Sequence, residues 1–340
     1  MLRPRALAEP GRAGLYHVCS RVVDRRVIFG KRERRKFMGL MKGGAAFAGV
    51  DLVSWGLMGN HFHLLVRVLP VNAEELSDEE VFSRMEQIYQ PPRMRHFRGL
   101  WERLEGEEAR RVFLAPFRAR MGNLSDFVKT LKQRFTQWFN RRTAREGTLW
   151  EGRFFSVMIS HNESDDGGGL GLLARFVAGY IDLNPVRAKV VREADDCDWS
   201  GFGSALRGDG EALAGMRILW GSTTTRGMDS PQILDLHRGM LARARFLDRD
   251  AEGAEMSNKV GHPEKSDDRE SSRICAAPDE GGVVKAGASG GQFEAGPPVQ
   301  DEASAAMQLE ACMLSLMGRR CMALTKRRAL GQSWMLSHIE

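Results

Sequence analysis

The chain has 340 residues, 42% of them hydrophobic, and carries 50 basic against 44 acidic side chains, a net charge of +6. This is enough apolar content to bury the core of one large domain or two small ones. No apolar run approaches the roughly 18 residues of a membrane span, and the basic start MLRPRALAEPGRAG lacks the apolar segment of a secretory signal. The five cysteines form no CxxC pair, so the sequence suggests neither a disulfide framework nor a thiolate zinc knuckle, and a cytoplasmic location is expected.

Charge is unevenly distributed along the chain. Residues 1–220 carry 35 basic and 27 acidic side chains, a net +8, whereas residues 221–340 carry 15 and 17, a net −2. Basic residues are densest between Ala109 and Arg153, where they alternate with aromatic residues: Phe127, Phe135, Trp138, Phe139 and Trp150. Such a segment can follow a phosphate backbone and stack on unpaired bases. A basic amphipathic helix with its aromatics in the core explains the same pattern, so both interpretations stay open.

The first 70 residues predict three strands and a helix. Residues 14–23 are β-branched and partly alternating, which indicates a strand. Residues 31–47 are basic and then rich in Ala and Met, as in a helix. Two further strands, 50–57 and 61–69, flank Gly59-Asn60, a turn signal.

The following residues predict more helices and one more strand. Residues 72–112 are polar and helical in character, with an interruption at Pro91-Pro92. Residues 124–142 have the clearest helical period, 154–160 form a fourth candidate strand, and 172–183 form another helix. Strands and helices do not alternate strictly, so we expect an α+β fold with an antiparallel sheet.

Composition changes after about residue 250. The next 50 residues are rich in Gly, Ser, Pro and charged residues and predict a disordered linker, and the remainder predicts a helical C-terminal tail. The expected domain organisation is a main domain at 1–205 with a helical insertion at about 72–121, a C-terminal extension of the core at 206–250, a linker at 251–300 and a tail at 301–340.

The segment Met58-Gly-Asn-His-Phe-His-Leu-Leu-Val66 places two histidines two residues apart in a predicted strand. His61 and His63 therefore project from one face, and two imidazoles at this spacing can converge on one metal ion. A purely structural histidine pair on a half-exposed strand explains the motif equally well.

A second segment, 175–185, places Tyr180 and Asn184 four residues apart, on one face of a predicted helix. The Asn184 carbonyl oxygen could complete a His-His-Asn metal site, with Tyr180 as a nucleophile on a phosphate. In the structural alternative, Asn184 is the N-cap of a helix over Pro185–Arg192 and Tyr180 belongs to the core.

Five stretches, taken in order, resemble the single-tyrosine transposases of the IS200/IS605 type, in particular the branch associated with repetitive extragenic palindromes (REP). The matching stretches are Gly14–Arg21, Met58–Val66, Leu131–Asn140, Leu149–Phe154 and Tyr180–Ala188. The resemblance spans roughly 190 residues and does not cover the linker or the tail. It implies a ferredoxin-like or RRM-like antiparallel sheet with helices, the HUH endonuclease core.

The resemblance also implies a site. His61, His63 and Asn184 would hold a divalent cation, Mg²⁺ or Mn²⁺, although this donor set also suits Zn²⁺. Tyr180 would be the nucleophile. DNA contacts would come from the basic segment, through Lys132, Arg134, Arg141, Arg142 and Arg153.

The implied activity is that of a DNA transposase that cleaves and rejoins single-stranded DNA next to hairpins through a 5′-phosphotyrosine intermediate. The expected partner is single-stranded or hairpin DNA, not a membrane, and relatives include dimers, so a homodimer is compatible with the sequence. Two alternatives remain: a non-catalytic hairpin-binding regulator that retains the fold, and a metal-dependent phosphodiesterase that uses water.

Overall fold

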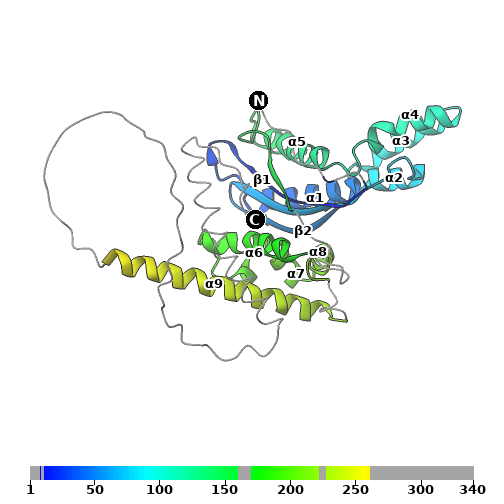
Figure 1. Cartoon of the computed structure of the whole chain (residues 1–340). Coiled ribbons are helices and arrows are strands. Elements are labelled where there is room, and N and C mark those ends of the chain that lie inside the picture. Colours follow the sequence, from blue (N-terminus) through cyan, green and yellow to red (C-terminus); the bar gives the residue numbers. More distant parts are fainter. Residues whose placement is uncertain (1–7, 9–10, 160–169, 222–226, 261–340) are drawn as a thin grey trace, which may run out of the picture.

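The computed structural model describes residues 8, 11–159, 170–221 and 227–260, with side chains up to residue 245. Its centre is a four-stranded sheet between two layers of helices (Figure 1). Helices α1 (Lys31–Ala48) and α5 (Leu124–Thr143) cover one face, and α6 (Leu172–Arg187) lies on the other. The predicted α+β class with an antiparallel sheet is confirmed.

The strands are β1 (Gly14–Arg21), β2 (Val50–Leu57), β3 (His61–Val68) and β4 (Phe155–Ile159), in the order β2-β3-β1-β4. Every neighbouring pair is antiparallel. A bulge at Val53 of β2 shifts the register against β3, so that Gly56 faces the same way as its partner His63.

Aromatic side chains fill the space between the sheet and the α1–α5 layer. Phe62 of β3 is fully buried, and its ring centroid lies 4.9 Å from that of Phe37 on α1. Phe37 in turn meets Phe135 of α5 at 5.4 Å. Burying each such ring contributes roughly 1.5–3 kcal/mol, which holds the helix layer on this face.

On the other face, α6 packs closely against β2. A Cβ added to Gly56 would lie 3.0 Å from Ile181 Cγ2 and 3.2 Å from the Ile181 carbonyl oxygen, so a larger residue would displace the helix. Pro185 lies inside α6 and has no N–H to donate back to that carbonyl. Because α6 continues to Arg187, Asn184 is inside a helix, and the expectation that it caps a new helix over Pro185–Arg192 is wrong.

A buried polar network fixes α6 against α7 (Gly201–Leu206), α8 (Gly210–Trp220) and α9 (Ser230–Val260). Asp182 of α6 accepts a hydrogen bond from the Phe202 amide (3.3 Å) and bonds His237 Nε2 (3.1 Å). Trp220 Nε1 donates to His237 Nδ1 (3.0 Å), so His237 Nε2 carries the hydrogen that Asp182 accepts. Asp182 and His237 are fully buried.

Helices α2 (Asp78–Glu86), α3 (Pro91–Glu102) and α4 (Glu107–Arg118) extend away from one end of the sheet (Figure 1). The Pro91-Pro92 pair begins α3, as expected for proline in a first helical turn. Helix α9 continues to Val260, so its last ten residues are not the start of the linker expected from residue 251. Residues 261–300 and the tail at 301–340 lie outside the described residues.

None of the described helices combines the length and the apolar character that crossing a bilayer requires.

Candidate active site

Three histidines gather on the sheet face that α6 covers. His61 and His63 lie on this face of β3, and His17 joins them from β1, where Cys19 pairs with His63. The ring centroids of His61 and His63 are 5.1 Å apart, and those of His17 and His63 are 5.2 Å apart. The sheet therefore supplies three neighbouring imidazoles.

Hydrogen bonds assign the ring nitrogens of this cluster. His61 Nδ1 lies 2.7 Å from Asn60 Oδ1, which can only accept, so His61 Nδ1 carries a hydrogen and Nε2 keeps its lone pair. His17 Nε2 and His63 Nδ1 are 3.0 Å apart. If His63 donates in this contact, its Nε2 likewise keeps a lone pair, the arrangement in which a second residue orients a metal-binding histidine.

Burial keeps these imidazoles neutral. Burial lowers the pKa of His17 to about 4, and burial together with the nearby Arg21 charge lowers the pKa of His61 to about 4. The pKa of His63 falls well below its ordinary value through burial and then through its histidine neighbours. Neutral imidazole is the form that binds a metal ion, so the cluster is ready to act as a ligand at neutral pH.

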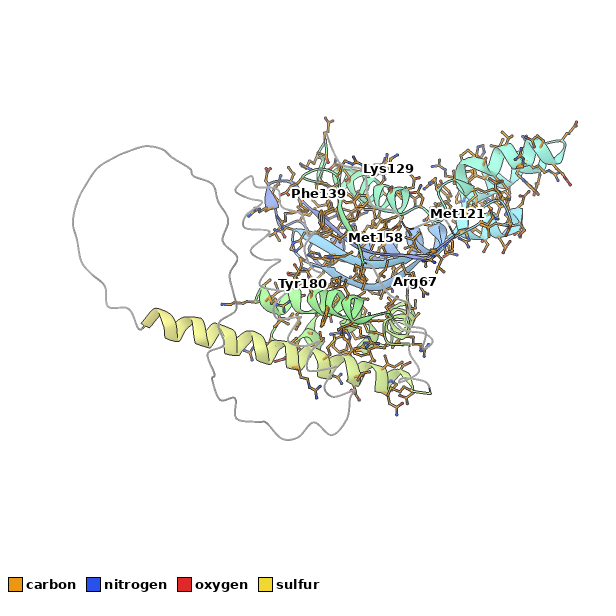
Figure 2. The ribbon with its side chains drawn as sticks, in the orientation of Figure 1. Arg67, Met121, Lys129, Phe139, Met158 and Tyr180 are labelled. Atoms are coloured by element: carbon orange, nitrogen blue, oxygen red, sulfur yellow. The ribbon has the colours of Figure 1, made fainter. Side chains whose placement is uncertain are left out.

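Helix α6 brings Tyr180 to the histidines. The Tyr180 ring is half-buried, and its centroid lies 5.7 Å from that of His63 and 6.1 Å from that of His17, edge-on in both cases. Arg187 Cζ lies 5.9 Å from the Tyr180 ring centroid and adds positive charge beside the phenol. Figure 2 shows Tyr180 on α6, across the sheet from Lys129 and Phe139 of α5.

The other two tyrosines of the chain are placed differently. Tyr16 is 3% exposed, lies on the opposite sheet face, and accepts a hydrogen bond from the Ala8 amide (2.8 Å). Tyr89, between α2 and α3, bonds Arg120 (3.3 Å). Of the three tyrosines, Tyr180 is the one beside the imidazoles.

Asn184 lies one helical turn beyond Tyr180. Its Nδ2 atom is buried and has no hydrogen-bond partner among the described residues. Two imidazole nitrogens and an amide oxygen suit a divalent transition-metal ion such as Mn²⁺ better than Mg²⁺, which prefers oxygen. No group of three His, Cys, Asp or Glu side chains placed to hold a metal ion occurs in the described part of the chain, so the three imidazoles alone do not form such a site.

Two of the five residues expected to contact DNA are largely engaged within the protein. Lys132 is 9% exposed and donates to the Gly152 carbonyl (2.8 Å), and burial lowers its pKa to about 8. Its ammonium thus joins α5 to the segment before β4, and the expected DNA contact does not fit this placement. Arg134 donates to the Ile88 carbonyl (2.7 Å) and is half-buried.

The remaining three lie at the surface. Arg142 forms an ion pair with Glu33 of α1, and Arg141 donates to the Gln137 carbonyl (3.1 Å). Arg153 is exposed and makes no ion pair with any described residue. The basic segment is therefore partly the core-facing helix of the structural interpretation and partly a charged surface.

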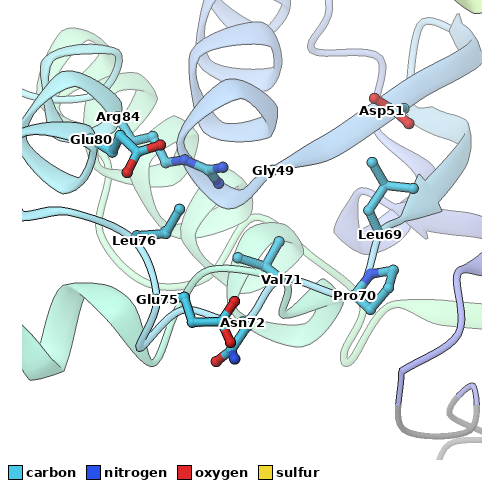
Figure 3. A pocket seen from close by; sticks show the side chains of 10 residues that line it. All are labelled: Gly49, Asp51, Leu69, Pro70, Val71, Asn72, Glu75, Leu76, Glu80 and Arg84. Atoms are coloured by element: carbon cyan, nitrogen blue, oxygen red, sulfur yellow. The ribbon is translucent and has the colours of Figure 1, made fainter.

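A cavity of about 480 Å³ lies elsewhere, where the ends of α1 and β3 meet α2 and the loop before it (Figure 3). Its lining includes Asp51, Glu75, Glu80 and Arg84 and contains none of the residues expected at the active site. The histidines and Tyr180 therefore do not share the cavity.

Sequence reasoning missed His17. The residue lies in the first strand, and its alternation with buried Tyr16 and Val18 gave no sign of a function. The pairing of β1 with β3 places it beside His63, and strand pairing between distant segments is not encoded in either segment alone.

Comparisons with known proteins add little. No protein-family model matches the chain, and no curated protein matches it. Among solved structures, the chain is similar to one described as a REP-associated tyrosine transposase bound to a REP hairpin, with a TM-score of 0.37, 14% identity, and coverage of 61% of this chain and 86% of that one. A likeness at this level carries no argument, so the functional conclusion rests on the geometry and on the motifs.

Proposed function

We propose that the protein is a transposase-like DNA strand transferase in which Tyr180 attacks a phosphodiester of single-stranded DNA beside a hairpin. The observation that carries the proposal is the juxtaposition of the Tyr180 ring, 5.7 Å from that of His63, with neutral His61 and His63 on one sheet face. The strand order β2-β3-β1-β4, with α1 and α5 on the opposite face, supports the ferredoxin-like HUH core that the motifs imply.

Each protein group has a defined task in this proposal. The Tyr180 oxygen forms a bond to phosphorus as the bond from phosphorus to the 3′ oxygen breaks. The phenol loses its proton, and the departing 3′ oxygen gains one. The products are a 5′-phosphotyrosine and a free 3′-hydroxyl, so the phosphodiester bond energy is retained for rejoining. Arg187 places a positive charge beside the Tyr180 ring, where it would offset negative charge that develops on the attacking oxygen.

His61, His63 and Asn184 are the residues that would hold a divalent cation. When bound, such an ion would offset negative charge on the scissile phosphate. His17 would orient His63 through the 3.0 Å hydrogen bond, and Asn60 would orient His61 through the 2.7 Å bond.

The experiment is to incubate the protein with Mg²⁺ or Mn²⁺ and an end-labelled DNA hairpin with single-stranded flanks, and to look for label that stays with the denatured protein. We expect an adduct that chelation prevents and that Tyr180→Phe abolishes while DNA binding persists. Tyr16→Phe is the matched control and should keep the adduct.

Other outcomes would identify the alternatives. Cleavage without an adduct would favour a phosphodiesterase that uses water, with Tyr180 structural. Binding without cleavage by the unaltered chain would favour a regulator that retains the fold. An adduct that survives Tyr180→Phe would assign the nucleophile to another residue.

A further inference from the structure

Three arginines from separate elements surround Tyr89, at the junction between the insertion and α5. Arg93 Cζ lies 5.1 Å and Arg134 Cζ 5.3 Å from the Tyr89 ring centroid, and Arg120 Nη1 donates to the Tyr89 hydroxyl (3.3 Å). Arg93 belongs to the first turn of α3, Arg120 follows α4, and Arg134 lies in the middle of α5. We call this group the Tyr89 arginine cluster.

The cluster concentrates positive charge without an acidic partner. None of its three arginines forms an ion pair with a carboxylate among the described residues. Burial lowers the pKa of Arg134, and the charges of Arg120 and Arg93 lower it further. Like charges this close are unfavourable unless an anion offsets them.

Three other arginines of the insertion are paired with carboxylates, so acidic residues are available nearby. Arg98 bonds Glu79 (2.7 Å) and Glu86 (3.4 Å), and Arg111 bonds Glu108 (2.8 Å). Arg118 bonds Asp78 (2.7 Å). These carboxylates are thus bonded to other arginines, and none of them pairs with the arginines around Tyr89.

The surroundings hold the cluster in place. Tyr89 packs edge-on against Phe97 at 5.2 Å and Phe117 at 6.2 Å. Arg134 is fixed by the Ile88 carbonyl, and Arg120 also reaches the Thr130 hydroxyl (3.4 Å). Arg93 is exposed and the other two are partly exposed, so a ligand can approach. Guanidinium groups held in fixed positions are suited to bind phosphate oxygens.

We propose that the Tyr89 arginine cluster binds backbone phosphates of the DNA, at a position remote from the phosphate that Tyr180 attacks. This inference rests on the proposed DNA partner and extends its contact surface onto the insertion. Helix α5, which carries Arg134 of the cluster, lies on the sheet face opposite α6 (Figure 1). The cluster would therefore bind a part of the DNA distant from the phosphate that Tyr180 attacks. The phosphates could come from a duplex stem or from a single-stranded flank.

The test compares two variants of the full chain with matched net charge. The cluster variant is Arg93→Gln with Arg120→Gln, and the control is Arg98→Gln with Arg111→Gln. Equilibrium binding is measured from 50 to 300 mM salt with a hairpin and with an unstructured strand of equal length, and thermal unfolding verifies folding of both. Arg93→Lys with Arg120→Lys keeps the charge and serves as a second check.

For the cluster variant we expect affinity to fall roughly tenfold for each arginine lost, and the slope of log K against log salt to decrease by about 0.9 per lost duplex contact or 0.7 per single-strand contact. The control variant should bind like the unaltered chain, and the lysine variant should retain most of the slope. A decrease in slope with the hairpin alone would assign the phosphates to a duplex stem. A decrease with the unstructured strand would assign them to single-stranded DNA.

Equal affinity and slope in the cluster and control variants, with both DNAs, would overturn the inference. That result would leave the proposed function standing if the unaltered chain still forms the Tyr180 adduct. Conversely, a reduced slope without any adduct would support the cluster and contradict the strand-transfer chemistry.

Discussion

Helix α6 has histidines on both sides, and they differ in what their ring nitrogens contact. On the α9 side, His237 uses both nitrogens, one toward Asp182 and one toward Trp220. On the sheet side, no carboxylate bonds His17, His61 or His63 among the described residues, and His61 and His63 each use one nitrogen. A histidine with both nitrogens satisfied supports structure, whereas one with a nitrogen left over is available for a ligand.

The largest expected effect is on the sheet side. His63→Ala should reduce adduct formation by at least about a thousandfold at every cation concentration, because it removes one of two imidazole ligands. DNA binding should persist. The adduct assay over a cation titration measures this, with exposed His96→Ala as the control. Undiminished activity of His63→Ala would refute the metal assignment.

On the α9 side, substitution of His237 should lower the stability of the fold and leave the chemistry of the site unchanged. His237→Ala leaves the Asp182 carboxylate buried without its partner, which costs about 3 kcal/mol in the free energy of unfolding. Chemical denaturation measures the loss. At a temperature where the variant is folded, the cation concentration for half-maximal adduct should be unchanged. A shifted cation requirement would show that the two histidine groups are not functionally separate.

Substitution of His17 tests whether the orientation of the metal ligand His63 affects the cation requirement. His17→Leu removes the hydrogen bond to His63 while leaving all three proposed metal ligands in place, and we expect a 10- to 100-fold higher cation requirement. Saturating cation should restore the adduct, which distinguishes this residue from His63. Failure of cation to restore activity would assign His17 a direct role.

Substitution of Asn60 should change the cation requirement least among these variants. Its side chain lies at the partly exposed end of β3, where water can replace the amide oxygen beside His61. Asn60→Ala should raise the cation requirement less than about tenfold. A larger shift than that of His17→Leu would reverse the proposed ranking of the two orienting contacts.

Most of the fold was predictable because its signals are local. The strand alternation around His61 and His63 and the helical period of α5 gave boundaries within a few residues of those observed. Pro185 was misleading: proline usually marks a helix start, yet packing of Ile181 on Gly56 holds α6 together through it. Tertiary contacts outweighed local preference at that position.

The site was predictable only in part. Spacing within one strand and one helix nominated His61, His63 and Tyr180, but His17 joins them through strand pairing that neither segment specifies. Lys132 has the same charge as its neighbours in the basic segment, and its burial follows from the packing of α5 against the Trp150 segment. Charge patterning does not distinguish a buried lysine from an exposed one.

The most direct test of the account is to locate the covalent attachment by mass spectrometry of the protein digested after reaction with the DNA hairpin. We predict a nucleotide mass on the peptide between Arg175 and Arg187, at Tyr180. A nucleotide on Tyr16, on Tyr89 or on a residue other than tyrosine would contradict the account, as would DNA cleavage that leaves every peptide unmodified.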